Sequence, residues 1–415
     1  MGKMAEESAR AAKELAKAEG RCKNNFLRDL AKLLRDRAGQ VLKANQRDVD
    51  AALASGLDAA RVDRLRMTEA TMESMAQACL EVMAQTDPVG EIETMWQRPN
   101  GLRIGRMRVP LGVVMMIYES RPNVTIEAAI LTLKAGNAAI LRGGSEAFHS
   151  NQSLANLITE ALRNAELPEA AVQLVPVTDR EAVGYLLKLD ELIDVVIPRG
   201  GESLIRAVAD QATMPVLKHY KGVCHIYVDQ NADLDKALDI VFNSKVQRCG
   251  VCNALECLLV HKDVASMFLP KVAERLGAAE VRFKACPESL PLLQSKADAD
   301  TADEGDWGRE FLALTLAVRV VRDMDQALEH IALYGSNHTE AILTRDHDRA
   351  MRFLREADAS LVLVNASTRF NDGGQLGLGA EIGISTSKLH AYGPMGVREL
   401  TGVKFVGLGQ GQIRE

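Results

Sequence analysis

The stretch GVVMMIYESRPNVTIEAAILTLKAGNAAILR, residues 112–142, decides the fold of this chain. It begins with a short apolar run, 112–118, continues through a helical pattern, 124–134, and ends in a second apolar run, 138–142. Short apolar runs joined by a helix are typical of parallel strands that are buried on both faces. The stretch therefore predicts a β-α-β unit of a doubly wound α/β domain.

The same alternation continues on both sides of this unit. Apolar runs at 172–175 and 194–197, each followed by helical sequence, extend the first sheet, and the helical pattern of residues 6–83 is expected to cover it. A second series predicts a second α/β domain, with strands at 224–228, 258–260, near 281, 314–321, 341–344 and 361–365. The predicted fold class is therefore α/β, with two doubly wound domains.

A hairpin interrupts the first domain. Residues 96–108 alternate apolar and basic side chains around an Asn-Gly turn, which is a hairpin signal. The edges of such a hairpin must be paired or protected, so residues 94–110 are predicted to form a small β oligomerisation flap, with a basic surface flap as the alternative. The tail at 400–406 is expected to be a strand that pairs with this hairpin or with another subunit.

These patterns divide the chain into three segments. Residues 1–222 are predicted to form a helical layer and the first α/β domain, residues 223–370 the second α/β domain, and residues 371–415 a return to the first domain that ends in an oligomerisation strand.

Composition restricts the function classes. The 415 residues are 47% hydrophobic and 26% charged, as in a soluble globular protein, and the net charge of -6 argues against nucleic acid as the main partner. No apolar run is long enough to cross a bilayer, and the start lacks the apolar core of a signal peptide. Seven scattered cysteines do not form a disulfide framework. We therefore expect a cytoplasmic protein with reduced thiols and no membrane partner.

Three strand ends of the first domain carry groups that suit an anion. Arg121 follows the first strand, Arg142 and Gly143 end the second, and Gly200, Gly201 and Ser203 follow the fourth. Glycines that open a helix let a phosphate approach free backbone N–H groups, and arginine adds charge-assisted hydrogen bonds. Gly-Gly is also an ordinary turn signal. Together the three ends predict a dinucleotide site, although none of these strands is followed by G-x-G-x-x-G.

Two cysteines, Cys249 and Cys252, lie on a turn between a helical pattern (234–244) and a short strand. A thiol held by two rigid elements suits a nucleophile, while the alternative is a small buried thiol. The pair also matches C-x-x-C, but no second pair and no neighbouring histidine in the sequence completes a zinc site. No metal is therefore predicted.

Several longer motifs occur in a fixed order along nearly the whole chain: YESRPNVT (118–125), LKAGNA (133–138), YGSNHTEAI (334–342), VNASTRF (364–370), GAEIGIST (379–386) and KLHAYGPMG (388–396). In these the chain resembles the aldehyde dehydrogenase superfamily, whose cofactor domain also lacks G-x-G-x-x-G. Within it the chain closely resembles the branch that reduces gamma-glutamyl phosphate to glutamate 5-semialdehyde, the second step of proline biosynthesis.

The resemblance implies that residues 1–222 contain the dinucleotide-binding domain, that residues 223–370 are the catalytic domain, and that residues 371–415 return to the cofactor domain. It also implies roles for particular residues. Cys252 takes the position of the nucleophile, and Cys249 does not share that role. Asn123 matches the asparagine that holds the oxyanion. Arg142 falls where the superfamily holds the adenosine ribose, and Glu310 falls near the glutamate that holds the nicotinamide ribose.

The resemblance also implies a reductase. Oxidising relatives carry a Glu-x-Gly-Gly base ahead of the nucleophile, whereas residues 218–222 are Lys-His-Tyr-Lys-Gly. Without that base a thioester on Cys252 survives until hydride arrives from NADPH. Arg121, Lys221 and Arg369 are the expected substrate-binding cations.

The partners implied are the small-molecule substrate, a glutamate kinase that channels it, and further copies of the chain in a homodimer or homotetramer. A CoA-acylating aldehyde dehydrogenase and a non-catalytic relative are the alternatives.

Overall fold

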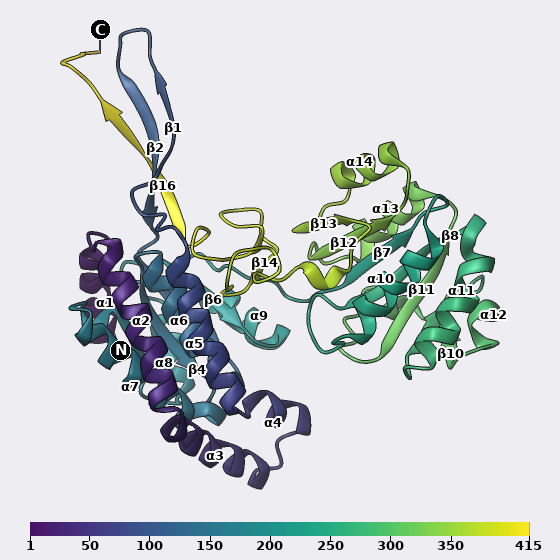
Figure 1. Cartoon of the computed structure of the whole chain (residues 1–415), viewed down its shortest axis with the longest axis horizontal. Coiled ribbons are helices and arrows are strands. Elements are labelled where there is room, and N and C mark those ends of the chain that lie inside the picture. Colours follow the sequence, from purple (N-terminus) through teal and green to yellow (C-terminus); the bar gives the residue numbers. More distant parts are fainter. Residues whose placement is uncertain (415) are drawn as a thin grey trace. The chain divides into compact units, whose positions relative to one another are not determined.

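The computed structural model describes residues 1–414, apart from the side chains of residues 59 and 60, and divides into two compact units (Figure 1). The first unit holds residues 1–218, 377–384 and 389–415, and the second holds residues 219–376 and 385–388. Each unit has its own parallel sheet and its own hydrophobic core. None of the described helices is long and apolar enough to cross a membrane.

The first unit is built around residues 112–142, which form a β-α-β unit. All six residues of its first strand, β3, are buried, as expected for a strand covered on both faces. The sheet is parallel throughout, and its strands in spatial order are β5 (Val172–Leu174), β4 (Ala138–Gly143), β3 (Val113–Tyr118) and β6 (Val195–Arg199). The chain adds β4 and β5 on one side of β3 and β6 on the other, so the strand order reverses at β3.

Helices cover this sheet. The predicted N-terminal helical layer is confirmed, because apolar side chains of its helices join the core of the first sheet. The helices are α1 (Gly2–Leu15), α2 (Gly20–Asp36), α3 (Ala38–Ala54), α4 (Ala59–Leu65), α5 (Glu69–Ala84), α6 (Asn123–Lys134), α7 (Phe148–Asn164), α8 (Arg180–Leu186) and α9 (Glu202–Gln211).

A three-stranded antiparallel arm projects from the first unit (Figure 1). The predicted hairpin forms β1 (Ile92–Gln97) and β2 (Arg103–Pro110), and the predicted tail strand, β16 (Thr401–Leu408), pairs with β2 along its whole length. The rings of Trp96 and Phe405 pack edge to face across the arm. The hairpin and its pairing with the tail are therefore confirmed.

The second unit contains a seven-stranded parallel sheet. Its strands in spatial order are β10 (Ala299–Thr301), β9 (Arg282–Ala285), β11 (Thr315–Val321), β8 (Leu255–His261), β7 (Cys224–Val228), β12 (Thr339–Leu343) and β13 (Leu361–Val364). Its helices are α10 (Leu234–Val246), α11 (Lys262–Gly277), α12 (Leu290–Gln294), α13 (Met324–Tyr334) and α14 (His347–Glu356). The central strands β7, β8 and β12 are wholly buried, and most of their residues are apolar. The buried charged side chains among them are paired, His225 with Glu340 and Glu256 with Lys245.

Candidate active site

Cys252 lies on the turn that leads from α10 to the buried strand β8 of the second unit. Asp233 caps the start of α10 by accepting from the Lys236 N–H, and a backbone hydrogen bond from Ala254 to Val251 closes the turn around Cys252. The side chain of Cys252 is half-buried. The turn therefore holds the thiol firmly while leaving it accessible.

Gly222 packs directly against this turn. A Cβ atom at position 222 would lie 2.0 Å from the carbonyl oxygen of Cys252, so only glycine fits there. The close contact places the segment 219–222, which follows the first unit, beside the nucleophile.

Two histidines meet the thiol. His219, Cys252 and His338 present donor atoms that all lie within 4.8 Å of one another, and the two imidazole rings pack edge to face at 5.5 Å. Burial raises the pKa of the Cys252 thiol, but the charge of His338 and a hydrogen bond from His219 outweigh burial and hold that pKa well below its usual range. Cys252 is therefore poised as a thiolate, the form that attacks carbonyl carbon.

The same three donors are of the kind that binds Zn²⁺, so experiments on this thiol need a chelator.

A second cysteine lies beneath the first. Cys224, fully buried at the start of β7, donates from its Sγ to the Cys252 carbonyl oxygen at 3.2 Å and lies 3.6 Å from His338 Nδ1. Burial, followed by the charge of Glu340, raises the pKa of Cys224 well above its usual range. Cys224 therefore stays protonated and supports the turn, whereas Cys252 carries the reactivity.

Glu310 and Lys221 come together at the same place. The Glu310 carboxylate accepts from the Gly222 N–H at 2.9 Å, and Lys221 Nζ donates to the Gly308 carbonyl at 2.7 Å. Burial raises the pKa of Glu310, the Gly222 N–H opposes that rise, and the nearby charge of Cys252 adds to it. The stretch 218–222 thus lacks a carboxylate of its own, but a downstream glutamate reaches its backbone.

A buried ion pair joins the two elements on either side of the Cys252 turn. Lys245 Nζ lies 2.7 Å from Glu256 Oε2, and both side chains are fully buried. Lys245 is at the end of α10 and Glu256 is in β8, so the pair joins the two elements that flank Cys252. Glu256 Oε1 also accepts from the Leu312 N–H at 3.2 Å, which ties the Glu310 segment to β8.

A further group of donors, His225, Cys257 and His330, lies in the core of the second unit. Arg319 Nη1 lies 2.9 Å from His330 Nδ1, and because arginine only donates, Nδ1 must accept. His330 Nε2, 3.5 Å from Cys257 Sγ, then carries the proton and has no lone pair for a metal. Burial, His225 and Arg319 lower the pKa of His330 to about 2, which agrees with a neutral ring. This group is a hydrogen-bond network.

The first unit contains a cavity of about 390 Å³ at the carboxyl ends of its strands. It lies where the strand order reverses, which is the usual ligand position in a doubly wound sheet. The lining includes the predicted residues Arg142 and Ser203 together with Arg180 and Glu146. Arg142 donates to the Thr178 carbonyl at 2.9 Å, while its buried Nε has no hydrogen-bond partner among the described residues.

The predicted glycines Gly143, Gly200 and Gly201 are not among the lining residues of this cavity. The Gly201 N–H at the start of α9 donates to the Glu119 carboxylate at 3.2 Å, so a negative group of the chain itself takes this helix terminus. A Cβ atom at Gly143 would lie 2.0 Å from Asn151, and one at Gly200 would lie 2.5 Å from Glu119. The cofactor role of these glycines stays a prediction.

Asn123 and Arg121 belong to the first unit. Asn123 is the first residue of α6, and its side-chain amide donates to Glu127 at 2.8 Å. Their roles at the thiol remain predictions. Of the predicted substrate cations, Lys221 and Arg369 are the two that the second unit itself contains.

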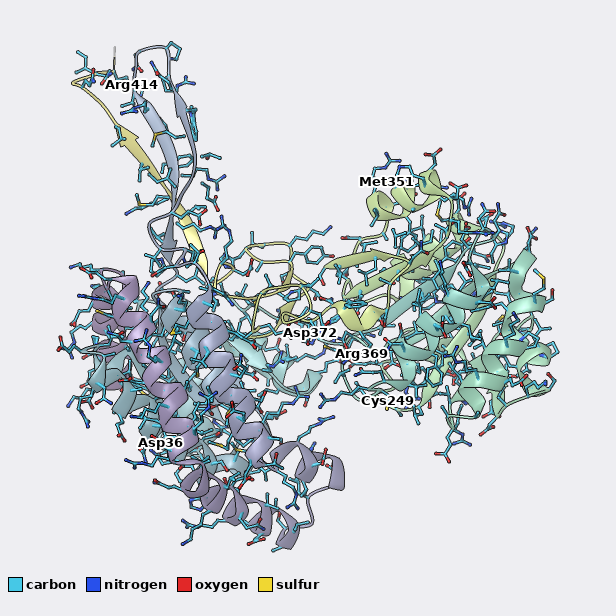
Figure 2. The ribbon with its side chains drawn as sticks, in the orientation of Figure 1. Asp36, Cys249, Met351, Arg369, Asp372 and Arg414 are labelled. Carbon is cyan, nitrogen blue, oxygen red and sulfur yellow. The ribbon has the colours of Figure 1, made fainter. Side chains whose placement is uncertain are left out.

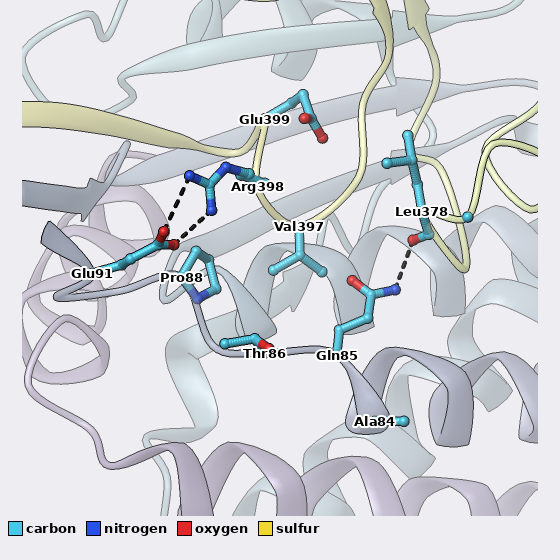
Figure 3. Close-up of a pocket in the computed structure, with 10 residues that line it drawn as sticks. Ala84, Gln85, Thr86, Pro88, Glu91, Leu378, Val397, Arg398 and Glu399 are labelled. Carbon is cyan, nitrogen blue, oxygen red and sulfur yellow. Dashed lines mark hydrogen bonds and ion pairs between the residues drawn. The ribbon is translucent and has the colours of Figure 1, made fainter. Parts of the chain in front are cut away.

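A different hollow, of about 360 Å³, lies at the base of the arm (Figure 3). Arg398 pairs there with Glu91, and the Gln85 amide donates to the Leu378 carbonyl. These polar groups of the lining therefore form hydrogen bonds with one another. The lining residues include no cysteine or histidine, so this hollow contains no pair like Cys252 and His338.

The low pKa of Cys252 gives a pH prediction. Because the ionised form is present above the lowered pKa, alkylation by iodoacetamide should stay fast as pH falls from 9 through 7 and slow only below that pKa. In His338→Asn the main opposing charge is lost and burial raises the pKa, so the rate at pH 7 should fall by about 10-fold or more, an unperturbed thiol being only a few per cent ionised there. Labelling of the Cys252 peptide is measured by mass spectrometry in a Cys249→Ser background, and identical pH profiles would contradict the assignment.

Sequence reasoning missed both histidines. His219 is 33 residues before Cys252 (252 − 219) and His338 is 86 residues after it (338 − 252), so no spacing rule links them. The available signal was their position in stretches already singled out, 218–222 and YGSNHTEAI.

Residues 1–288 match the model of the aldehyde dehydrogenase family. A gamma-glutamyl phosphate reductase of Nitratidesulfovibrio vulgaris (strain DP4) is 66% identical over 408 residues, covering 98% of this chain and 97% of that protein. The protein of the same name from Desulfovibrio desulfuricans is 62% identical over 417 residues, covering 100% and 99%.

Solved structures agree with these matches. The crystal structure of gamma-glutamyl phosphate reductase from Thermotoga maritima has a TM-score of 0.96 at 46% identity and covers 100% of this chain and 99% of that one. An acetylating aldehyde dehydrogenase from Geobacillus thermoglucosidasius, at 18% identity and a TM-score of 0.70, covers 100% and 97% and shares the fold.

Proposed function

The chain belongs to the aldehyde dehydrogenase family, as a gamma-glutamyl phosphate reductase, and on that premise we propose that it reduces L-glutamyl 5-phosphate to L-glutamate 5-semialdehyde and phosphate through a thioester on Cys252. As a member of this family it is an oxidoreductase that uses a nicotinamide cofactor. The observation that carries the proposal is the half-buried thiol of Cys252, kept as a thiolate by His219 and His338.

The first half of the reaction needs only the chain's own groups. The Cys252 thiolate attacks the acyl carbon, a C–S bond forms, and the C–O bond to phosphate breaks. The charge on the tetrahedral oxygen would be stabilised by backbone N–H groups of the Cys252 turn, and the Asn123 side chain is the second donor that the family resemblance implies. When the C–S bond forms, the sulfur becomes neutral, and His338 and His219 no longer face an anion. After the thioester has been reduced to a thiohemiacetal, the C–S bond breaks, and the two histidines stabilise the thiolate that leaves.

The cofactor supplies the hydride that reduces the thioester. Arg142, Gly143, Gly200, Gly201 and Ser203 would hold it at the strand ends of the first unit, and Glu310 would meet its nicotinamide ribose. The support is the 390 Å³ cavity, which contains two arginines, Arg142 and Arg180, and a buried unpartnered nitrogen on Arg142. Two guanidinium groups favour the additional phosphate of NADPH over NADH.

Water must be kept from the thioester. The stretch 218–222 carries no carboxylate, and Glu310 is engaged by the Gly222 N–H. Burial raises the pKa of Glu310, so basicity alone would not exclude it as a base. Because one of its oxygens is held by the Gly222 N–H and its expected role is to bind the nicotinamide ribose, we expect hydride transfer to be favoured over hydrolysis.

The arm supports self-association. Its sheet has two open edges, β1 and β16, and Phe405 on β16 is 73% exposed. Exposed edges and large apolar side chains are features of a surface that pairs with another chain. We propose that the arm is the oligomerisation flap of a homodimer or homotetramer in the cytoplasm, and that a glutamate kinase delivers the labile acyl phosphate.

The test is an assay of the reverse reaction with purified protein. Glutamate 5-semialdehyde and inorganic phosphate should reduce NADP, and coenzyme A should not replace phosphate. NADP should be preferred to NAD. Turnover that needs coenzyme A instead of phosphate would identify a CoA-acylating enzyme, and no turnover with either would leave a non-catalytic relative.

A further inference from the structure

One basic site beside Cys252 has no role in the scheme above. The segment that contains Arg369, η4 (Thr368–Phe370), is anchored to the end of α10 and the turn after it. Ser367 Oγ lies 2.9 Å from Ser244 Oγ, and the Thr368 N–H donates to the same Ser244 oxygen at 3.3 Å. These bonds fix the position of the short helix relative to α10.

Arg369 itself is held at the nucleophile turn. Its Nε donates to Gln247 Oε1 at 2.8 Å, and Gln247 is the residue before Arg248. From the other side, the Asn253 amide donates to the Asn371 carbonyl at 2.9 Å and lies 3.5 Å from the Arg369 carbonyl. The Arg369 segment is therefore attached at both ends of the five residues that run from Arg248 to Cys252 (Arg369 and Cys249 are labelled in Figure 2).

The hydrogen bond to Gln247 holds Arg369 at the residue that precedes Arg248, so two arginines belong to the same turn. In agreement with this, burial lowers the pKa of Arg369, the charge of Arg248 lowers it further, and Asp372 opposes both. Neither arginine forms an ion pair with a carboxylate within 4.0 Å among residues 1–414. Two like charges at one turn repel each other, and a bound anion relieves that repulsion.

The chemistry identifies the anion. The bond that breaks joins phosphate to the carbon that Cys252 attacks, so the phosphate must lie next to the sulfur. The carboxylate at the amino-acid end of the substrate is separated from that carbon by the rest of the glutamyl chain. A dianion also matches two guanidinium groups, whereas a single carboxylate needs one.

We propose that Arg248 and Arg369 form the phosphate-binding site of the substrate, with Arg248 as a second cation that no sequence motif assigned. This proposal rests on the proposed function, because the phosphate in question is that of an acyl phosphate. As the C–O bond breaks, its electron pair moves to the departing phosphate, and the two guanidinium groups stabilise the charge that gathers there.

Kinetics of the reverse reaction test the assignment. In Arg248→Gln and in Arg369→Gln, the KM for inorganic phosphate should rise about 10-fold or more, as expected when a charge-assisted hydrogen bond is lost. The KM for the semialdehyde should change by less than about 3-fold. The control is Arg322→Gln, because Arg322 is an exposed arginine of the same unit whose guanidinium is already paired with Asp323 at 2.9 Å. Neither constant should change in that control.

A binding measurement keeps the result independent of turnover. Inorganic phosphate should slow the alkylation of Cys252 in a saturable way, and the half-protecting concentration should rise about 10-fold or more in Arg248→Gln. Because Arg248 is exposed, this variant is expected to fold even if the Arg369 variant does not.

The outcomes separate the two proposals. Protection by phosphate in a protein that shows no turnover would support the anion site and refute the proposed reaction. A rise in the semialdehyde KM with an unchanged phosphate KM would overturn the inference and place these arginines at the amino-acid end. Unchanged constants and unchanged protection in both variants would also overturn it.

Discussion

Replacing Cys252 with alanine should lower the rate of semialdehyde oxidation by at least about 10⁴-fold, because loss of a covalent nucleophile costs that much or more in enzymes where it has been separated from binding. Cofactor binding should persist, since the predicted cofactor groups lie on other elements. The measurements are steady-state turnover and a titration of cofactor fluorescence.

Cys249→Ser is the matched control. Cys249 shares the turn and the half-buried environment of Cys252, but it is not part of the group formed with His219 and His338. Its turnover should stay within about 3-fold of the parent. If Cys252→Ala retained turnover, or if Cys249→Ser lost it, the assignment of Cys252 as the nucleophile would be wrong.

Breaking the buried Lys245–Glu256 pair should be the most damaging change to stability. Lys245→Met removes one partner of a fully buried pair and leaves the Glu256 carboxylate without a cation, which costs about 3–5 kcal/mol of unfolding free energy. Since the pair joins α10 to β8 across the Cys252 turn, alkylation of Cys252 should also change. Adding Glu256→Gln removes the uncompensated charge, keeps an acceptor for the Leu312 N–H, and should recover part of the loss.

The measurement must report the second unit, because a chain with two units need not unfold in one step. Trp307 is buried in that unit, so its fluorescence during urea unfolding, in a Trp96→Phe background, follows the unit that contains the pair. Lys271→Met is the control, because Lys271 pairs with Asp235 at 3.2 Å on the surface and should cost less than about 1 kcal/mol. If Lys245→Met and Lys271→Met lost equal amounts of unfolding free energy, burial of the Lys245–Glu256 pair would be unimportant for stability.

Most of the fold could be predicted because its signals are local. A strand buried on both faces, such as β3, is a continuous apolar run, and the Asn-Gly turn between β1 and β2 fixes a hairpin within a few residues. The tail strand was predictable as a strand, and its pairing with β2 was one of two alternatives.

The site was predictable only in part because its groups converge from distant segments. The motif resemblance identified Cys252, but His338 reaches the thiol from the loop before β12, and Arg369 reaches Gln247 of the same turn from the loop after β13. Glu310 shows the same limit. Residues 218–222 contain no carboxylate, yet the fold places Glu310, 88 residues after Gly222 (310 − 222), where it accepts from the Gly222 N–H.

The pairing of β16 with β2 has a consequence for synthesis of the chain. The hairpin is complete at Pro110, but its third strand begins at Thr401, 291 residues later (401 − 110). At translation rates of about 5–20 residues per second, a nascent chain presents the open edge of β2 for roughly 15–60 s before the covering strand exists. During that interval the edge can pair with another chain, so we expect the arm to be the part of this protein that most needs a chaperone.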